Sequence, residues 1–171
     1  ISISASNSIE MSNILNTVES GGIQSRSIGT SPDASSGGNI SLTAGQSVTI
    51  KNGASVSASS TGPGNAGNIF INAGQQLEVL DSPNAITTQA ARASGGNIDI
   101  RAIDRVRLVN SSISTSVLSA DGSGGNIFID PKVVILEGSS VTAQAVGGAG
   151  GQIKFVTPLF LADSSSTVNA Q

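Results

Sequence analysis

The sequence contains no cysteine, histidine, tryptophan or tyrosine. Without cysteine, the chain forms no disulfide bond and has no thiol chemistry. Proline is scarce, with 5 residues in 171, and phenylalanine supplies the only 4 aromatic side chains. No stretch shows the hydrophobic periodicity of a helix of about ten residues or more, which excludes folds that alternate strands with helices.

Charge and long apolar runs are also scarce. Charged residues make up 11% of the chain and the net charge is −3, whereas about a quarter of an average domain is charged. There is no basic run, so we expect no nucleic-acid partner. No apolar run approaches the ~20 residues that a membrane-spanning helix needs. Because low charge combined with 37% hydrophobic residues is the reverse of a disordered composition, the chain is expected to fold.

One short motif, glycine followed by an amide residue and two apolar residues in alternation, occurs five times. Its copies are residues 38–42, 67–71, 96–100, 125–129 and a degenerate copy at 151–155. The amide residues are Asn39, Asn68, Asn97, Asn126 and Gln152. Their successive numbers differ by 29, 29, 29 and 26. A fixed period of this length indicates a repeat architecture.

Each repeat contains three short strand patterns. The first has apolar pairs at Ile1/Ile3, Ile40/Leu42, Ile69/Ile71, Ile98/Ile100, Ile127/Ile129 and Ile153/Phe155. The second has Ile9/Met11, Val48/Ile50, Leu77/Val79, Val106/Leu108, Val134/Leu136 and Leu159/Leu161. The third begins at Ile23, Val56, Ile86, Ile113, Val141 and Val168, with inward small residues at Ser25, Ala58, Thr88, Thr115, Ala143 and Ala170. Apolar residues at every second position are typical of strands with one buried face.

Three strands in each repeat of ~29 residues predict an all-β fold, a right-handed parallel β-helix of about six rungs. Each strand should pair with its equivalent one period later, about 4.8 Å along the axis. A leucine-rich repeat lacks its core motif here, and a propeller blade needs four strands and a longer period. The glycine pairs before each amide residue should close the third corner, where positive φ is often needed.

Residues 1–171 are therefore interpreted as a single β-helix segment, either a piece of a longer chain or a subunit of a stacking fibre. Exposed terminal strands are templates for further strands, so both ends should be covered by more rungs or by identical copies stacked head to tail. The candidate residues for axial stacking are Ile1, Ile3, Ile153, Phe155 and Val168.

The rungs resemble the shaft repeats of filamentous-haemagglutinin-like exoproteins of two-partner secretion systems. The sequences of residues 64–71 (GNAGNIFI) and 124–131 (GGNIFIDP) look most like those of cyanobacterial members. The resemblance covers essentially all rungs but does not include the family's N-terminal secretion domain. It implies an extracellular or cell-surface bacterial protein, an adhesin or fibre without catalysis, and a host or cell-surface glycan as a candidate partner.

The amide column has two interpretations. Asn39, Asn68, Asn97, Asn126 and Gln152 can form a structural ladder in which stacked amides satisfy polar groups at a tight corner, or they can bind a ligand. We favour the ladder. The outer Ser/Thr row of the third strands (Ser57, Thr87, Ser114 and Thr142) is interpreted as a solvated face, with ice or glycan binding as the alternative.

The alternative is that the chain is a carbohydrate-binding or polysaccharide-cleaving β-helix, and a cleaving site would need carboxylates gathered at one place. No two of them recur in one column on adjacent rungs. Glu78 instead shares a column with Arg107, and Arg101 with Asp130, which predicts ladder ion pairs. Residues 121–125 resemble glycine–aspartate calcium turns, but the nonapeptide period is absent. We therefore expect no enzyme, no cofactor and no metal site.

Three phenylalanines are expected to point outward: Phe70 and Phe128 in the first strand pattern and Phe160 in the second. Ile135 should lie beside Phe160 in the adjacent rung. Clustered outward apolar residues need an explanation. A loop could cover them, or they could form a lateral contact with a partner or a second shaft.

Overall fold

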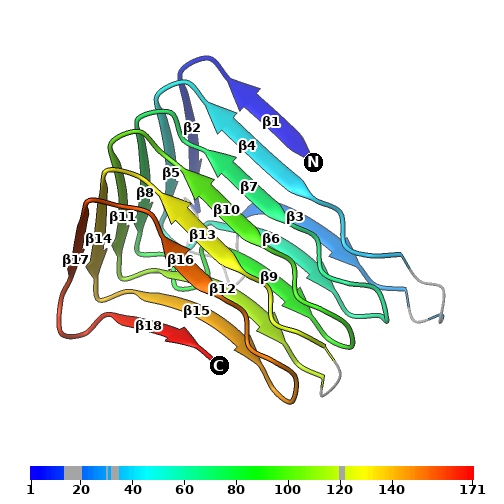
Figure 1. Ribbon diagram of the computed structural model, residues 1–171. Helices are drawn as coiled ribbons and strands as arrows, with labels where there is room; N and C mark the ends of the chain where they lie inside the picture. The colour runs from blue at the N-terminus through cyan, green and yellow to red at the C-terminus, as the bar shows by residue number, and fades with distance from the viewer. Residues whose placement is uncertain (14–20, 30, 32–34, 120–121) are drawn as a thin grey trace.

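The computed structural model describes residues 1–13, 21–29, 31, 35–119 and 122–171. Over these residues the chain forms a parallel β-solenoid with 18 strands and no helix. The strands lie in three sheets of six, and each rung gives one strand to each sheet. Figure 1 shows the sheets as three walls of stacked arrows, with the N- and C-termini at opposite ends. The prediction of a parallel β-helix is confirmed.

The three sheets are named A, B and C. Sheet A consists of β1 (Ser2–Ala5), β4 (Ile40–Ala44), β7 (Ile69–Asn72), β10 (Ile98–Arg101), β13 (Ile127–Asp130) and β16 (Ile153–Phe155). Sheet B consists of β2 (Ser8–Ser12), β5 (Ser47–Lys51), β8 (Gln76–Leu80), β11 (Arg105–Val109), β14 (Val133–Glu137) and β17 (Leu159–Ala162). Sheet C consists of β3 (Gly22–Ser27), β6 (Ser55–Ser60), β9 (Ile86–Ala90), β12 (Ser112–Val117), β15 (Ser140–Ala145) and β18 (Thr167–Ala170).

The core is a set of inward columns that run the length of the solenoid. In sheet A, Ile98 pairs with Ile69 and Ile127, and Ile100 pairs with Ile71 and Ile129. All six side chains are at most 1% exposed. β-Branched residues suit this position because they pack well on the pleated surface of a sheet. Burying each such side chain contributes about 1.5–3 kcal/mol, so the columns are the main source of stability.

The register of the last strand in sheet B differs from the sequence prediction. Val134 pairs with Phe160 and Leu136 pairs with Ala162. Because Val134 and Leu136 point into the core, Phe160 lies in an inward column, and Leu159 and Leu161 lie on the outer face. The predicted pair Leu159/Leu161 is therefore wrong by one residue, and so are the outward position of Phe160 and its place beside Ile135.

The corners also differ from expectation in where positive φ occurs. The glycine pairs before the amide residues have no positive φ. They are glycines because the rungs approach closely there: a Cβ on Gly96 would collide with the carbonyl of Gly67. Positive φ recurs instead at the corner between sheets B and C, at Asn52, Asp81, Asn110 and Gly138. Asparagine, aspartate and glycine tolerate this conformation best.

Candidate functional site

The amide column is a continuous hydrogen-bonded ladder at the corner that leads into sheet A. The Oδ1 atom of Asn97 accepts a bond of 2.8 Å from the backbone N–H of Asn126. The same 2.8 Å bond joins Asn68 to Asn39, Asn97 to Asn68 and Gln152 to Asn126. The backbone carbonyls bond in the opposite direction, as when Ile98 N–H donates to Asn126 O at 2.9 Å. The column is thus occupied in holding one rung to the next.

A second ladder, which the sequence analysis did not identify, lies at the corner between sheets B and C. Ser82 N–H donates to Ser111 Oγ at 3.1 Å, and Ser111 N–H donates to Ser139 Oγ at 3.2 Å. The Ser111 hydroxyl in turn donates to the carbonyl of Val109. Ser82, Ser111 and Ser139 are each at most 3% exposed. The signal was a serine two residues after the end of the second strand pattern in three consecutive rungs.

The charged side chains pair diagonally between strands. Arg107 makes a bidentate bond to Glu137 at 3.0 and 3.1 Å, and Glu78 is bonded by Arg105 at 2.8 Å. The register does align Glu78 with Arg107, but the predicted direct pair is replaced by these diagonal ones. The hydrogen bond from Arg107 to Glu137 raises the pKa of Arg107 above its ordinary value.

The predicted pair of Arg101 with Asp130 is also replaced. Arg101 bonds Asp99, two residues earlier on the same strand, with two contacts of 3.0 Å. This hydrogen bonding is the main reason that the pKa of Arg101 is raised, and Asp130 adds a weaker electrostatic contribution. In the described part of the chain, the carboxylates with a cationic partner within 4.0 Å are Glu10, Glu78, Asp99, Asp104 and Glu137.

Arg101 also covers the two outward phenylalanines of sheet A. Its guanidinium carbon lies 5.9 Å from the ring centre of Phe70 and 5.8 Å from that of Phe128. The Nζ atom of Lys154 lies 6.0 Å from the ring centre of Phe128. These are cation–π distances. Phe70 and Phe128 are therefore half-buried, and cationic side chains of the same sheet form their cover.

The axial candidates lie at the two ends. Ile1 and Ile3 are 53% and 36% exposed, and Val168 is 46% exposed. Ile153 and Phe155 are partly buried and continue the inward columns of β13. Phe155 makes an edge contact with Phe160, with ring centres 4.9 Å apart, and Phe160 is 41% exposed. The end of the last rung is thus an apolar surface formed by inward-column side chains.

The outer face of sheet B changes character along the axis. Its first rungs carry Ser8, Glu10, Ser47 and Thr49, whereas its last two rungs carry Val133, Ile135, Leu159 and Leu161. Ile135 lies beside Leu161. Leu159 and Leu161 are each 47% exposed. The lateral apolar surface expected around Phe160 is therefore present on this sheet, but it is made by these four aliphatic residues.

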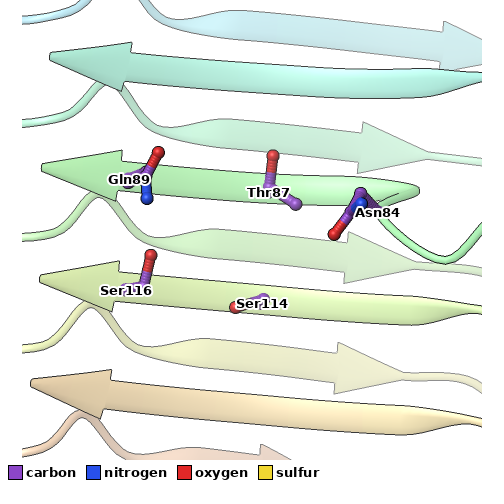
Figure 2. A pocket seen from close by; sticks show the side chains of 5 residues that line it. All are labelled: Asn84, Thr87, Gln89, Ser114 and Ser116. Carbon is purple, nitrogen blue, oxygen red and sulfur yellow. The ribbon is translucent and has the colours of Figure 1, made fainter. Parts of the chain in front are cut away.

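Sheet C carries a polar hollow on its outer face, called the sheet-C hollow below. Thr87 and Gln89 of β9 and Ser114 and Ser116 of β12 form its floor, and Asn84 stands at the entry to β9 (Figure 2). A second depression continues it toward the N-terminal end and shares Asn84 and Thr87. The further residues that line it are Gln24, Arg26, Gly53, Ser55 and Ser57.

Within the described ranges, no group of three or more His, Cys, Asp or Glu side chains could hold a metal ion. Asp121, which begins the calcium-like turn, lies outside these ranges. No described helix is long and apolar enough to cross a membrane. The chain matches no protein-family model, no curated protein and no solved structure.

Proposed function

We propose that this chain is a non-catalytic shaft segment of an extracellular bacterial fibre or adhesin. The shaft elongates because further β-helical rungs cover each end of the solenoid. Those rungs belong to the same polypeptide or to identical copies stacked head to tail. The resemblance of the repeats to filamentous-haemagglutinin-like exoproteins supports the location at the bacterial surface and export by two-partner secretion.

The observation that carries this proposal is the contrast in exposure within single columns. Leu42 and Ile71 are fully buried, whereas Ile3, at the end of the same column, is 36% exposed. At the other end, Phe160 and Val168 continue columns whose preceding members, Val134 and Val141, are fully buried. One added rung at each end would bury these side chains and pair the open strand edges at the same time.

The side walls support a passive role. In the described part of the chain, Glu10, Glu78, Asp99 and Glu137 of sheets A and B are bound to arginine or lysine, and the corner amides and serines are bound to neighbouring rungs. A polysaccharide-cleaving site would instead need two carboxyl groups facing a substrate about 5–9 Å apart. Groups already paired with cations or with the backbone are poorly suited to that work.

Association of the native protein through its ends tests the proposal. Phe160→Lys places a charge on the terminal apolar surface and should abolish end-to-end association, because the charge would have to be buried between rungs. Thr49→Lys, on the outer face of β5, is the matched control and should leave association unchanged. Sedimentation velocity measures both. Equal association of the two variants would contradict axial stacking.

A further inference from the structure

The sheet-C hollow owes its shape to one irregular corner. Five residues connect Leu80 to Ile86, whereas three connect the equivalent residues Val109 and Ile113 one rung later. The longer connection places exposed Pro83 and Asn84 beside the outer face of sheet C. The hydroxyl of Ser112 in the next rung donates a hydrogen bond to the carbonyl of Pro83. This bond fixes the corner, whose Asn84 forms the wall of the hollow, to the sheet. The hollow is therefore preformed.

The side chains that line the hollow keep their hydrogen-bonding capacity free. The side chains of Asn84, Thr87, Gln89, Ser114 and Ser116 form no hydrogen bond with any described residue. Several polar groups of the other faces are engaged instead: Asp99 and Glu137 bind arginine, and the corner amides bind the next rung. In the hollow, these donors and acceptors face solvent together on a rigid sheet.

The chemistry of the lining defines the class of ligand. Among the described residues that line one depression or the other, Arg26 is the only charged one, and none is aromatic. Strong recognition of an anion needs a cluster of cationic donors, and an apolar ligand needs an apolar lining. Hydroxyl and amide groups that both donate and accept suit a neutral ligand that is dense in hydroxyl groups and can replace the water bound there.

The extent of the hollow points to a chain and not to a single small molecule. Together with the depression that continues it, the hollow is lined by residues of four consecutive strands of sheet C, from β3 to β12. Three inter-strand steps of ~4.8 Å span about 14 Å along the axis. The rungs also repeat hydroxyl groups at this constant interval, as in the row Ser57, Thr87 and Ser114. A linear polymer with regularly spaced hydroxyl groups matches both features.

We propose that the sheet-C hollow binds a neutral linear polysaccharide that lies along the solenoid axis. Asn84, Thr87, Gln89, Ser114 and Ser116 bond its hydroxyl groups, and the irregular corner that carries Asn84 confines one side. Because the lining has no aromatic ring on which a sugar could stack, the affinity for a short oligosaccharide is weak, with a Kd of about 1 mM. Binding here is independent of the axial ends.

The test is titration of the ¹⁵N-labelled protein, followed by NMR, with maltohexaose and with cellohexaose. At least one of them should shift the amide signals of β9 and β12 with saturation in the millimolar range. Glucose should bind at least tenfold more weakly, because it contacts a single rung. A heparin hexasaccharide, the anionic probe, should produce no saturable shift there.

Paired variants locate the site. Thr87→Val with Gln89→Leu removes the donors and acceptors of the β9 floor and should weaken binding at least tenfold. Thr142→Val with Gln144→Leu makes the same changes in the same two columns on β15, outside the hollow, and should leave binding unchanged. Matching melting temperatures will show that both variants fold.

Three results would overturn the proposal. One is that neither neutral hexasaccharide binds. The second is that heparin or glucose binds as tightly as the neutral hexasaccharides. The third is that the β15 pair of substitutions weakens binding as much as the β9 pair.

Discussion

The middle rungs and the last rung of the solenoid follow different rules. From β4 to β13 the amide ladder advances by 29 at every step, and the inward side chains of sheets A and B in this stretch are at most 3% exposed. The last step of the ladder is only 26. Phe160, which lies 26 residues after its partner Val134, enters the inward column that the apolar pattern had given to Leu159 or Leu161. In the middle rungs the period and the apolar alternation both indicate the register, whereas in the last rung only the step of 26, which sheets A and B share, indicates it.

The observed register of β17 gives Phe160 an aromatic partner. Facing inward, its ring makes an edge contact with Phe155 at 4.9 Å. Such aromatic contacts are worth about 0.5–1.5 kcal/mol beyond the buried area. The opposite register would place this ring on the surface and Leu161 beneath Leu136. A slip by one residue exchanges the two faces of a strand, so the aromatic contact favours the observed register over the opposite one.

The largest expected effect compares the two regions within one column. Ile98→Asp buries an unpaired charge in a middle rung and should cost several kcal/mol. Ile153→Asp makes the same change in the last rung, where Ile153 is partly buried, and should cost clearly less. Chemical denaturation of both variants measures the difference. Equal stability of Ile98→Asp and the wild type would mean that sheet A is out of register by one residue.

The serine ladder should give the next largest effect. Ser111→Ala leaves the backbone N–H of Ser82 without its acceptor in a buried corner, which should cost about 1–3 kcal/mol. Ser114→Ala removes a hydroxyl that points outward from the same rung and should change the unfolding free energy by less than about 0.5 kcal/mol. If the two variants have the same melting temperature, the buried serine ladder adds no more stability than an exposed serine does.

The register of the last rung is tested by a pair of neighbours. Phe160→Ala removes the contact with Phe155 and should cost about 1–2 kcal/mol, since the ring is half-buried. Leu161→Ala should cost less, because Leu161 lies on the outer face. Thermal unfolding ranks the two. A larger loss for Leu161→Ala would restore the alignment that the sequence alone suggested.

The inward columns could be predicted from the sequence in some strands but not in others. The columns of sheet A were predictable because apolar and polar residues alternate at Ile98-Asp99-Ile100-Arg101 and at Ile40-Ser41-Leu42-Thr43. In Leu159-Phe160-Leu161-Ala162 every residue is apolar, so alternation cannot distinguish the two faces.

The surface was less predictable than the columns. Aligned charges at Glu78 and Arg107 suggested a direct ion pair, but long side chains reach diagonal neighbours as easily. The sheet-C hollow depends on the connection at residues 81–85, which a count of rungs records only as one longer corner. The Ser/Thr row was visible in the sequence, but its wall was not.

Substitutions in the amide ladder should also cost more stability in the middle rungs than in the last rung, but the difference should be smaller. Asn97→Ala removes the acceptor of Asn126 N–H and should cost about 1 kcal/mol, since this exposed N–H can bond water instead. Gln152→Ala, at the last position of the column, removes no acceptor that a described rung uses and should cost close to nothing. Urea midpoints measure both. Loss of a ligand without loss of stability would identify the column as a binding site.

The smallest effect is a pH dependence confined to the last rung. Asp163 accepts hydrogen bonds from Ser166, from the backbone of Gly138 and from Ser165, and these bonds lower the pKa of its carboxyl below the ordinary 3.8. Its contribution to stability is therefore complete above the ordinary pKa and declines as the pH falls toward the lowered value. The protection of the Gly138 and Ser165 amides from hydrogen exchange, relative to their intrinsic rates at each pH, should fall in that range.

Asp163→Asn is the control for this effect. The variant should show no such loss of protection, and the protection of the Gly53 amide, in a middle corner, should not change in either protein. A uniform response along the solenoid would show that the acid effect does not arise at Asp163.

The length of the native particle tests the central claim most directly. Six rungs at ~4.8 Å give a solenoid of about 29 Å. Electron microscopy of the native protein should show rods or fibres several times longer, because further rungs cover both apolar ends. Dispersed particles only six rungs long at high concentration, with both terminal rungs open to solvent, would contradict it.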